Sequence, residues 1–117
     1  MNVIGGLGNQ MFQYAFARAL KEKYPMDRVM IDIHHFKHYS LHNGYELERI
    51  FENISLPIAT AKDIIKLSYY CPNYKISRAI RRLLPARCSE FIQHDRKKGS
   101  SYIYDTKAME VVGSVYY

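Results

Sequence analysis

The stretch MNVIGGLGNQMFQYAFARALKEKYPMDRVMIDI, residues 1–33, decides the fold that we expect for this chain. Residues 1–4 are mostly apolar and run directly into Gly5, Gly6 and Gly8. A short strand that ends in a glycine turn is the simplest interpretation, because glycine permits tight backbone turns. A second apolar run, residues 28–33, predicts another strand that is buried on both faces.

A helix is expected between these strands, from about Asn9 to Tyr24. The apolar residues of this segment recur at the spacing of one buried helical stripe: Phe12, Ala15, Phe16, Ala19 and Leu20. Asn9 is a candidate N-cap, and Lys21, Lys23 and Pro25 provide the expected end. Strand, glycine turn, helix and strand form a βαβ unit, so we predict an α/β fold with a Rossmann-like parallel sheet.

Beyond residue 33 the pattern is weaker. Residues 34–44 read as a polar, histidine-rich loop, and residues 45–51 as a short helix. Thr60 and Asp63 resemble a capping box that opens a helix to about Tyr70. A basic helix is expected over 76–84, and a strand within 111–116. Two or three strands are too few for a parallel sheet, so we expect residues 1–117 to be a truncated N-terminal domain.

The net charge of +6 favours anionic partners. Much of it lies in two runs, residues 78–87 and 96–98. A solvated helix face with a basic loop explains these runs, and contact with anionic lipid or with a partner domain is the alternative. Nucleic acid is the least supported partner, because no recognised motif accompanies the charge.

The location that we predict is the cytoplasm. Cys71 and Cys88 are too few for a disulfide framework and lack zinc-ligand spacing, which fits free thiols in a reducing compartment. The first apolar stretch, Val3-Ile4, is too short for a signal peptide or a membrane span. Peripheral contact with the inner membrane through the basic segments is compatible with this location.

Chemistry is concentrated in the glycine turn. Free N–H groups at a helix start, together with the helix dipole, favour a phosphate or a sugar oxygen. The turn lacks the third glycine of a dinucleotide fingerprint, because position 11 is Met, and no Gly-Lys-Ser/Thr follows as in a P-loop. From the residues alone, a ligand-binding loop and a tight turn that serves helix packing are equally good interpretations.

Two long runs carry a resemblance to a known family. Residues 5–15, GGLGNQMFQYA, and residues 41–51, LHNGYELERIF, resemble segments of glycosyltransferase family 11, the bacterial α-1,2-fucosyltransferases. Ile31-Asp32-Ile33 and Phe36-Lys37 also fit that family. The resemblance covers about the first 60 residues and implies a GT-B type fold, in which two Rossmann-like domains enclose a cleft.

The resemblance implies that the enzyme transfers L-fucose from GDP-L-fucose to the 2-hydroxyl of a terminal galactoside, with inversion and without a metal or other cofactor. It places donor-binding roles on Gly6, Gly8, Asn9 and Gln10. The family's His-x-Arg-x-Gly-Asp motif, whose arginine binds the GDP phosphates, is absent from this sequence. Because a diphosphate needs such a bidentate cation, we expect the chain to be inactive by itself, without a C-terminal GDP-binding domain.

The catalytic base is not identified by the sequence. An inverting transfer needs a base near the acceptor hydroxyl, and Asp32, His42 and Glu46 are candidates that also have ordinary structural interpretations. His34, His35, His38 and His42 crowd one loop, where polar loop residues are favoured over a metal site.

Two further interpretations remain open. Within the same chemistry, the glycine loop also fits a protein O-fucosyltransferase-like or nodulation-type enzyme. In a different class, the chain is a non-catalytic nucleotide- or anion-binding module, whose basic helix docks a partner or a membrane.

Overall fold

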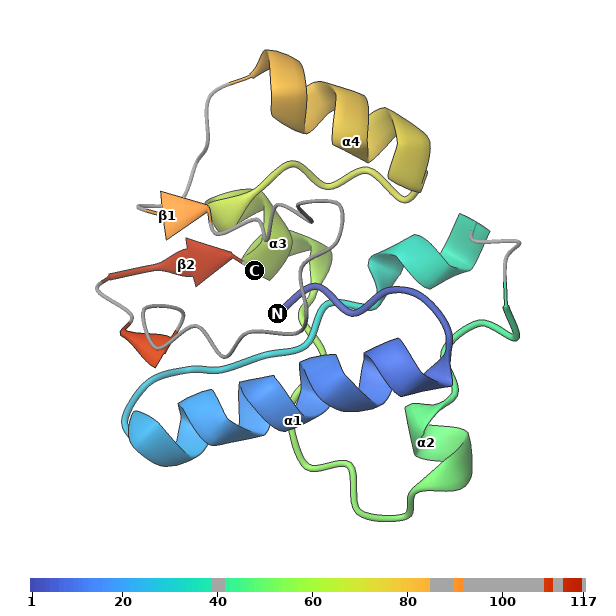
Figure 1. Cartoon of the computed structure of the whole chain (residues 1–117). Coiled ribbons are helices and arrows are strands. Elements are labelled where there is room, and N and C mark those ends of the chain that lie inside the picture. The colour runs from blue at the N-terminus through green and yellow to red at the C-terminus, as the bar shows by residue number, and fades with distance from the viewer. Residues whose placement is uncertain (39–41, 85–89, 92–108, 111–112, 117) are drawn as a thin grey trace, which may run out of the picture.

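The computed structural model describes residues 1–38, 42–84, 90–91, 109–110 and 113–116. Cys88, the basic run 96–98 and position 41 of the second family-like run lie outside these ranges. Figure 1 shows helices arranged around a small central set of extended segments. The elements in chain order are α1 (Leu7–Lys23), the 3-10 helix η1 (His34–His38), α2 (Leu47–Ile50), α3 (Ala61–Leu67), α4 (Tyr74–Leu83), β1 (Glu90–Phe91) and β2 (Val115–Tyr116).

Three extended segments run parallel and side by side. Asn2 bridges Asp32, where the Val3 N–H donates to the Asp32 carbonyl at 2.8 Å and the Asp32 N–H donates to the Met1 carbonyl at 2.7 Å. On the other edge, Ile31 bridges Ile58 in the same parallel sense. The predicted strands 1–4 and 28–33 are therefore parallel neighbours, paired through isolated bridges. The wider Rossmann-like and GT-B architecture stays a prediction.

The helix predicted after the glycine turn is present as α1, but it begins two residues early. Its N-cap is Gly6, with an extended backbone (φ −73°, ψ 172°), so the expectation that Asn9 is the N-cap is wrong. Asn9 occupies the third helical position, and its side chain lies beside Gly5. At the other end the Tyr24 N–H donates to the Leu20 carbonyl, and Lys21 and Lys23 lie in the last turn.

The buried stripe of α1 also differs from the predicted one. Phe12 is 79% exposed, and Ala15 is exposed as well. The buried residues are Gln10, Ala17 and Leu20, at i, i+7 and i+10. Of the predicted stripe, Leu20 is therefore confirmed as buried, and Phe16 and Ala19 are half-buried. The physical reason is that the side chain of Gln10 is held inside by hydrogen bonds, so a polar residue and not the largest aromatic one sets the rotation of the helix.

The hydrophobic core lies between α1 and the parallel segments. Val3, Ala17, Ile31 and Leu56 form its fully buried centre. Around them pack partly buried apolar residues from the same segments, from η1 and from the loop before α2: Met1, Tyr14, Val29, Ile33, Phe36 and Tyr45. The core thus fixes the first strand segment, and with it the glycine turn, against α1.

The helices α3 and α4 lie where the sequence predicts helices, but their lengths differ from the predicted ones. Thr60 and Asp63 form the predicted capping box at the start of α3: the Asp63 N–H donates to the Thr60 hydroxyl and the Thr60 N–H donates to the Asp63 carboxylate. The helix ends at Leu67, three residues before the predicted Tyr70. α4 starts at Tyr74 because the Asn73 side chain caps it.

The remaining predicted elements are short. α2 occupies four residues of the helix expected over 45–51. β2 falls within the strand expected over 111–116 and pairs in parallel with β1, with Tyr116 opposite Phe91; residues 111–112 are outside the described ranges. In the described part of the chain, no helix has the length and apolar character needed to cross a membrane.

Candidate functional site

The three glycines of the turn have three different surroundings. Gly5 has φ +92°, which strains any other residue, and a Cβ there would lie 2.6 Å from the Asn9 Nδ2, so the Asn9 side chain would also have to move. A Cβ on Gly6 would lie 3.1 Å from Nδ1 of His42. Gly8 is exposed, and among the residues that the structure describes nothing lies within 4 Å of its Cβ position. Gly8 therefore leaves open space at the start of α1.

The first turn of α1 offers backbone N–H groups. The Gln10 N–H donates to the Gly6 carbonyl at 3.1 Å, as the first bond of the helix. The N–H groups of Leu7, Gly8 and Asn9 precede it and have no carbonyl one turn earlier within the helix. Gly6 supplies no side-chain cap. The N–H groups and the positive end of the helix dipole together favour an anion at this point.

The side chain of Gln10 joins this turn to the loop at residues 42–46. Its Nε2 donates to the carbonyls of Gly5 (2.9 Å) and Gly44 (2.8 Å), and its Oε1 accepts from the Glu46 N–H at 2.9 Å. Gln10 is fully buried. Both amide hydrogens and the oxygen are thus engaged within the protein, which makes Gln10 a positioning residue here. Its predicted contact with a donor stays a prediction.

The loop that Gln10 holds contains two residues in the left-handed region, His42 (φ 63°) and Gly44 (φ +80°). A histidine in this region is strained relative to glycine, so the loop conformation depends on its surroundings. The imidazole of His42 is exposed and lies against Gly6. This places a titratable side chain beside the helix start, as a candidate contact for a bound anion.

Glu46 belongs to the same cluster but is largely buried. It is 6% exposed, and its Oε1 accepts from Arg49 Nη2 at 2.6 Å and from Asn43 Nδ2 at 3.4 Å. The structure therefore brings Gly6, Gln10, His42 and Glu46 together, with Gly8 and Asn9 exposed at the same helix start. A role of Glu46 as the base would require it to leave the ion pair with Arg49.

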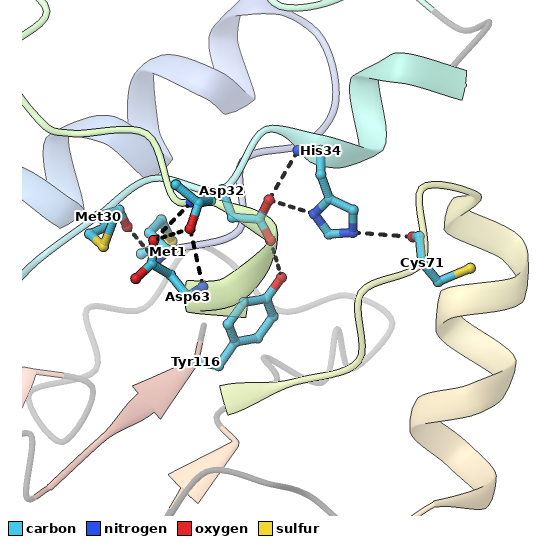
Figure 2. Close-up of polar contacts among 8 residues, drawn as sticks. Met1, Met30, Asp32, His34, Asp63, Cys71 and Tyr116 are labelled. Carbon is cyan, nitrogen blue, oxygen red and sulfur yellow. Dashed lines mark hydrogen bonds and ion pairs between the residues drawn. The ribbon is translucent and has the colours of Figure 1, made fainter. Parts of the chain in front are cut away.

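Asp32, the remaining candidate, lies in a separate buried network (Figure 2). It is 1% exposed, and one carboxylate oxygen accepts from both the backbone N–H of His34 (3.0 Å) and the His34 ring at Nδ1 (2.5 Å). The other oxygen accepts from the Tyr116 hydroxyl at 2.5 Å. These partners engage both carboxylate oxygens of Asp32 within the protein, and its candidate role as a base stays a prediction.

The ring of His34 faces an acceptor on each side. Nδ1 contacts the Asp32 carboxylate, and Nε2 lies 3.1 Å from the Cys71 carbonyl. The ring is therefore held between two oxygen acceptors, one at its own strand end and one 37 residues further along the chain. Burial alone would raise the pKa of the Asp32 carboxyl, but the hydrogen bonds from His34 and Tyr116 outweigh it and hold that pKa below its usual value.

Sequence reasoning missed His34 and Tyr116 as members of this network. The Asp-x-His spacing at the end of a strand is a local signal, because an Asp side chain commonly accepts from the backbone N–H two residues later. For Tyr116 no such signal exists, since 84 residues separate it from Asp32. The histidines singled out as one loop are also divided: His34 and His35 are in ring contact at 3.9 Å, whereas His42 lies at the glycine turn. In the described ranges no three His, Cys, Asp or Glu side chains gather as a metal-ligand set.

The amino terminus is buried next to this network. The Met1 ammonium group donates to the Met30 carbonyl at 2.8 Å. Burial lowers the pKa of this amine to about 6, against a smaller opposing effect of the Asp32 charge. The folded state therefore disfavours the charged amine.

This burial predicts a pH-dependent stability for a chain that begins at Met1. The unfolded amine binds a proton below about pH 8 and the folded one only below about pH 6, so stability should rise by about 2 kcal/mol between pH 6 and 8. Urea unfolding at both pH values measures this. An N-terminally acetylated chain is the control, because it retains the histidines and lacks the titrating amine. An equal change in the free energy of unfolding between the two pH values for both chains would contradict the prediction.

A cavity of about 480 Å³ lies on the same side of the molecule as the Asp32 network. Met1, Met30, Asp32 and Tyr116 contribute to its walls, together with residues of α3 and the end of α1. None of the glycines at the turn lines it. The cavity and the glycine turn are therefore two distinct features of the described structure.

Comparison with known proteins gives one relationship. No family model matches the chain, and no solved structure matches it. The chain is 36% identical over 80 residues to an alpha-1,2-colitosyltransferase of Escherichia coli. The match covers 67% of this chain and 24% of that protein, so the chain spans about a quarter of the length of the curated relative it matches. Over these residues the chain is a distant homologue of a glycosyltransferase.

Proposed function

We propose that this chain is the donor-binding N-terminal part of a glycosyltransferase that moves L-fucose from GDP-L-fucose to the 2-hydroxyl of a terminal galactoside, with inversion. The observation that carries the proposal is the uncapped start of α1 at Gly6, open at Gly8, in a chain homologous to a glycosyltransferase. The donor's diphosphate would accept hydrogen bonds from the first N–H groups of α1.

The neighbourhood of the turn supports this role for Gly6, Gly8 and Asn9. Gly8 permits an approach to the backbone that any larger residue would obstruct. His42 lies against Gly6 and would add a positive charge when protonated. Gln10 would act indirectly, as a positioning residue, because its hydrogen bonds keep the turn and the His42 loop together.

A second cationic group is required for turnover. The sequence contains no His-x-Arg-x-Gly-Asp motif, and backbone N–H groups only supplement the bidentate contact that arginine makes with a diphosphate. We therefore propose that a C-terminal domain completes the site. This chain alone should bind the donor weakly and transfer no sugar.

The identity of the sugar is the finer part of the proposal. The relative is named for transfer of colitose, and colitose is L-fucose without its 3-hydroxyl group. A panel of GDP-L-fucose, GDP-colitose and GDP-mannose, assayed with galactoside acceptors on the protein from the complete reading frame, separates the possibilities. Preference for GDP-colitose would replace L-fucose in the proposal and leave glycosyl transfer intact.

Donor contact can be tested on the chain itself. Titration of ¹⁵N-labelled protein with GDP-L-fucose should shift the amide signals of Gly6, Gly8 and Asn9. Gly8→Val should weaken this binding at least tenfold, because the side chain occupies the open approach, and should leave the fold intact since nothing described lies within 4 Å. Ala15→Val, at an exposed position two turns along α1, is the matched control. Donor-induced shifts that cluster elsewhere on the chain and leave the turn unchanged would exclude the turn as the donor site.

The alternative is a non-catalytic nucleotide- or anion-binding module. It is favoured by the same helix start, which would accept any diphosphate. Such a module would bind GDP, GDP-L-fucose and inorganic pyrophosphate equally. The gene distinguishes the two as well: a frame that continues past the Tyr117 codon and encodes His-x-Arg-x-Gly-Asp supports the enzyme, and its absence supports the module.

A further inference from the structure

Helix α4 has one buried side and a broad exposed side. Ser77, 2% exposed, faces the protein, and Tyr74 contacts the His35 ring edge-on with 5.5 Å between ring centres. On the outer side, Ile76 is 53% exposed and Leu83 is 82% exposed. Figure 1 shows α4 on the opposite side of the molecule from α1. The helix therefore presents apolar side chains away from the rest of the described structure.

Basic residues run beside this apolar stripe. Lys75, Arg78 and Arg82 are exposed and recur at i, i+3 and i+7, which places them on one face of the helix. At about 100° per residue, Ile76, Ala79 and Leu83 form the adjacent stripe. No acidic residue occurs in the α4 sequence YKISRAIRRL, so its charge is not neutralised within the helix.

We propose that the outer side of α4 lies on the surface of an anionic lipid bilayer. Amphipathic helices at a membrane interface combine an apolar face with lysine and arginine beside it, and α4 has both on its exposed side. Ile76 and Leu83 would enter the headgroup region, while Lys75, Arg78 and Arg82 would contact lipid phosphates. Charge complementarity selects anionic lipid over a neutral surface.

The adjacent arrangement of the two stripes argues for this occupant. A solvated basic face would not need exposed isoleucine and leucine next to it, because those side chains gain nothing from water. A purely electrostatic partner would leave them exposed too. A bilayer interface accommodates both kinds of side chain at one depth, with long basic side chains extending toward the phosphates.

Co-sedimentation of the full chain with vesicles tests the proposal. Binding is expected with phosphatidylglycerol and phosphatidylcholine mixed at 1:1 and not with phosphatidylcholine alone. The double variant Arg78→Glu/Arg82→Glu should weaken binding by roughly 30-fold or by a larger factor. Lys62→Glu/Lys66→Glu is the matched control, since it makes the same charge change at exposed positions of α3 and should retain most of the binding.

A second variant separates lipid insertion from simple charge attraction. Ile76→Ser/Leu83→Ser keeps every charge, and both residues are exposed, so the fold should persist. It should lose at least tenfold in binding at 0.5 M NaCl, where charge attraction is screened. Circular dichroism verifies that each variant is folded.

Three results would overturn the proposal. These are equal binding to neutral vesicles, an equal loss in the α3 control, and no binding to anionic vesicles by the unaltered chain. A fourth is a dimer in lipid-free solution that Ile76→Ser/Leu83→Ser converts to a monomer, because α4 would then be a contact between copies. All four outcomes are independent of whether the chain binds GDP-L-fucose.

Discussion

Asp32→Asn is expected to lower the free energy of unfolding by about 3 kcal/mol or more, because each hydrogen bond to a buried charged group is worth about 1.5–3 kcal/mol. The carboxylate accepts from the His34 ring, from the His34 backbone N–H and from the Tyr116 hydroxyl inside the protein. The Nδ2 group of an asparagine cannot accept a hydrogen bond, so the donor that faces it loses its acceptor. Urea unfolding at pH 7 measures the difference.

Two other variants serve as controls for Asp32. Tyr116→Phe removes one hydrogen bond to Asp32 and keeps the contact with His34. A loss of about 2 kcal/mol in the free energy of unfolding is therefore expected. Asp63→Asn makes the same chemical change in the solvent-accessible capping box of α3, where a clearly smaller loss in the free energy of unfolding is expected because water can replace the lost contacts. A loss at Asp32 no larger than that at Asp63 would mean that the buried pair does not form.

Gln10→Glu is expected to lower the free energy of unfolding by about 3 kcal/mol or more. The introduced carboxylate has nearly the same shape, but it cannot donate to the carbonyls of Gly5 and Gly44, and it is fully buried near Glu46. Protonation of the new carboxyl restores one donor, so the loss should shrink as the pH falls toward 5. Thermal unfolding at pH 5 and pH 8 measures both effects.

Asn9→Asp is the matched control for Gln10. It exchanges an amide for a carboxylate at the adjacent position, which is exposed and lies in the first turn of α1. A negative charge there interacts favourably with the helix dipole, so stability should change by less than about 1 kcal/mol. If both changes cost the same, the hydrogen bonds of Gln10 do not hold the turn.

Local patterns predicted much of the described fold. The glycine turn, α1, the capping box of α3 and the parallel neighbours 1–4 and 28–33 all follow from short-range signals such as periodicity and cap residues. The rotation of α1 did not, because apolar spacing favoured Phe12 and gave no weight to Gln10. A buried glutamine is recognisable only when its partners, such as the Gly44 carbonyl, are known in space.

The candidate site was predicted in part. Glycines and polar residues drew attention to the turn, but whether a side chain faces solvent or is used internally depends on contacts remote in sequence. Asp32 illustrates this, since Tyr116 and Cys71 lie far along the chain from the residues that they help to fix. The sequence identifies candidate side chains, and the fold determines which of them are engaged within the protein and which can contact a ligand.

The position of segment 28–33 between two parallel partners has a consequence for the order of folding. Asn2 pairs with Asp32 and Ile31 pairs with Ile58, so each pairing closes a loop of about 30 residues. The entropy cost of closing each loop precedes the stabilising contacts, which slows the pairing. α1 spans the first loop and can shorten it by forming early. During synthesis, the middle segment exposes an unpaired edge until residues 57–59 emerge from the ribosome. During that interval the unpaired edge is available for pairing with another extended segment.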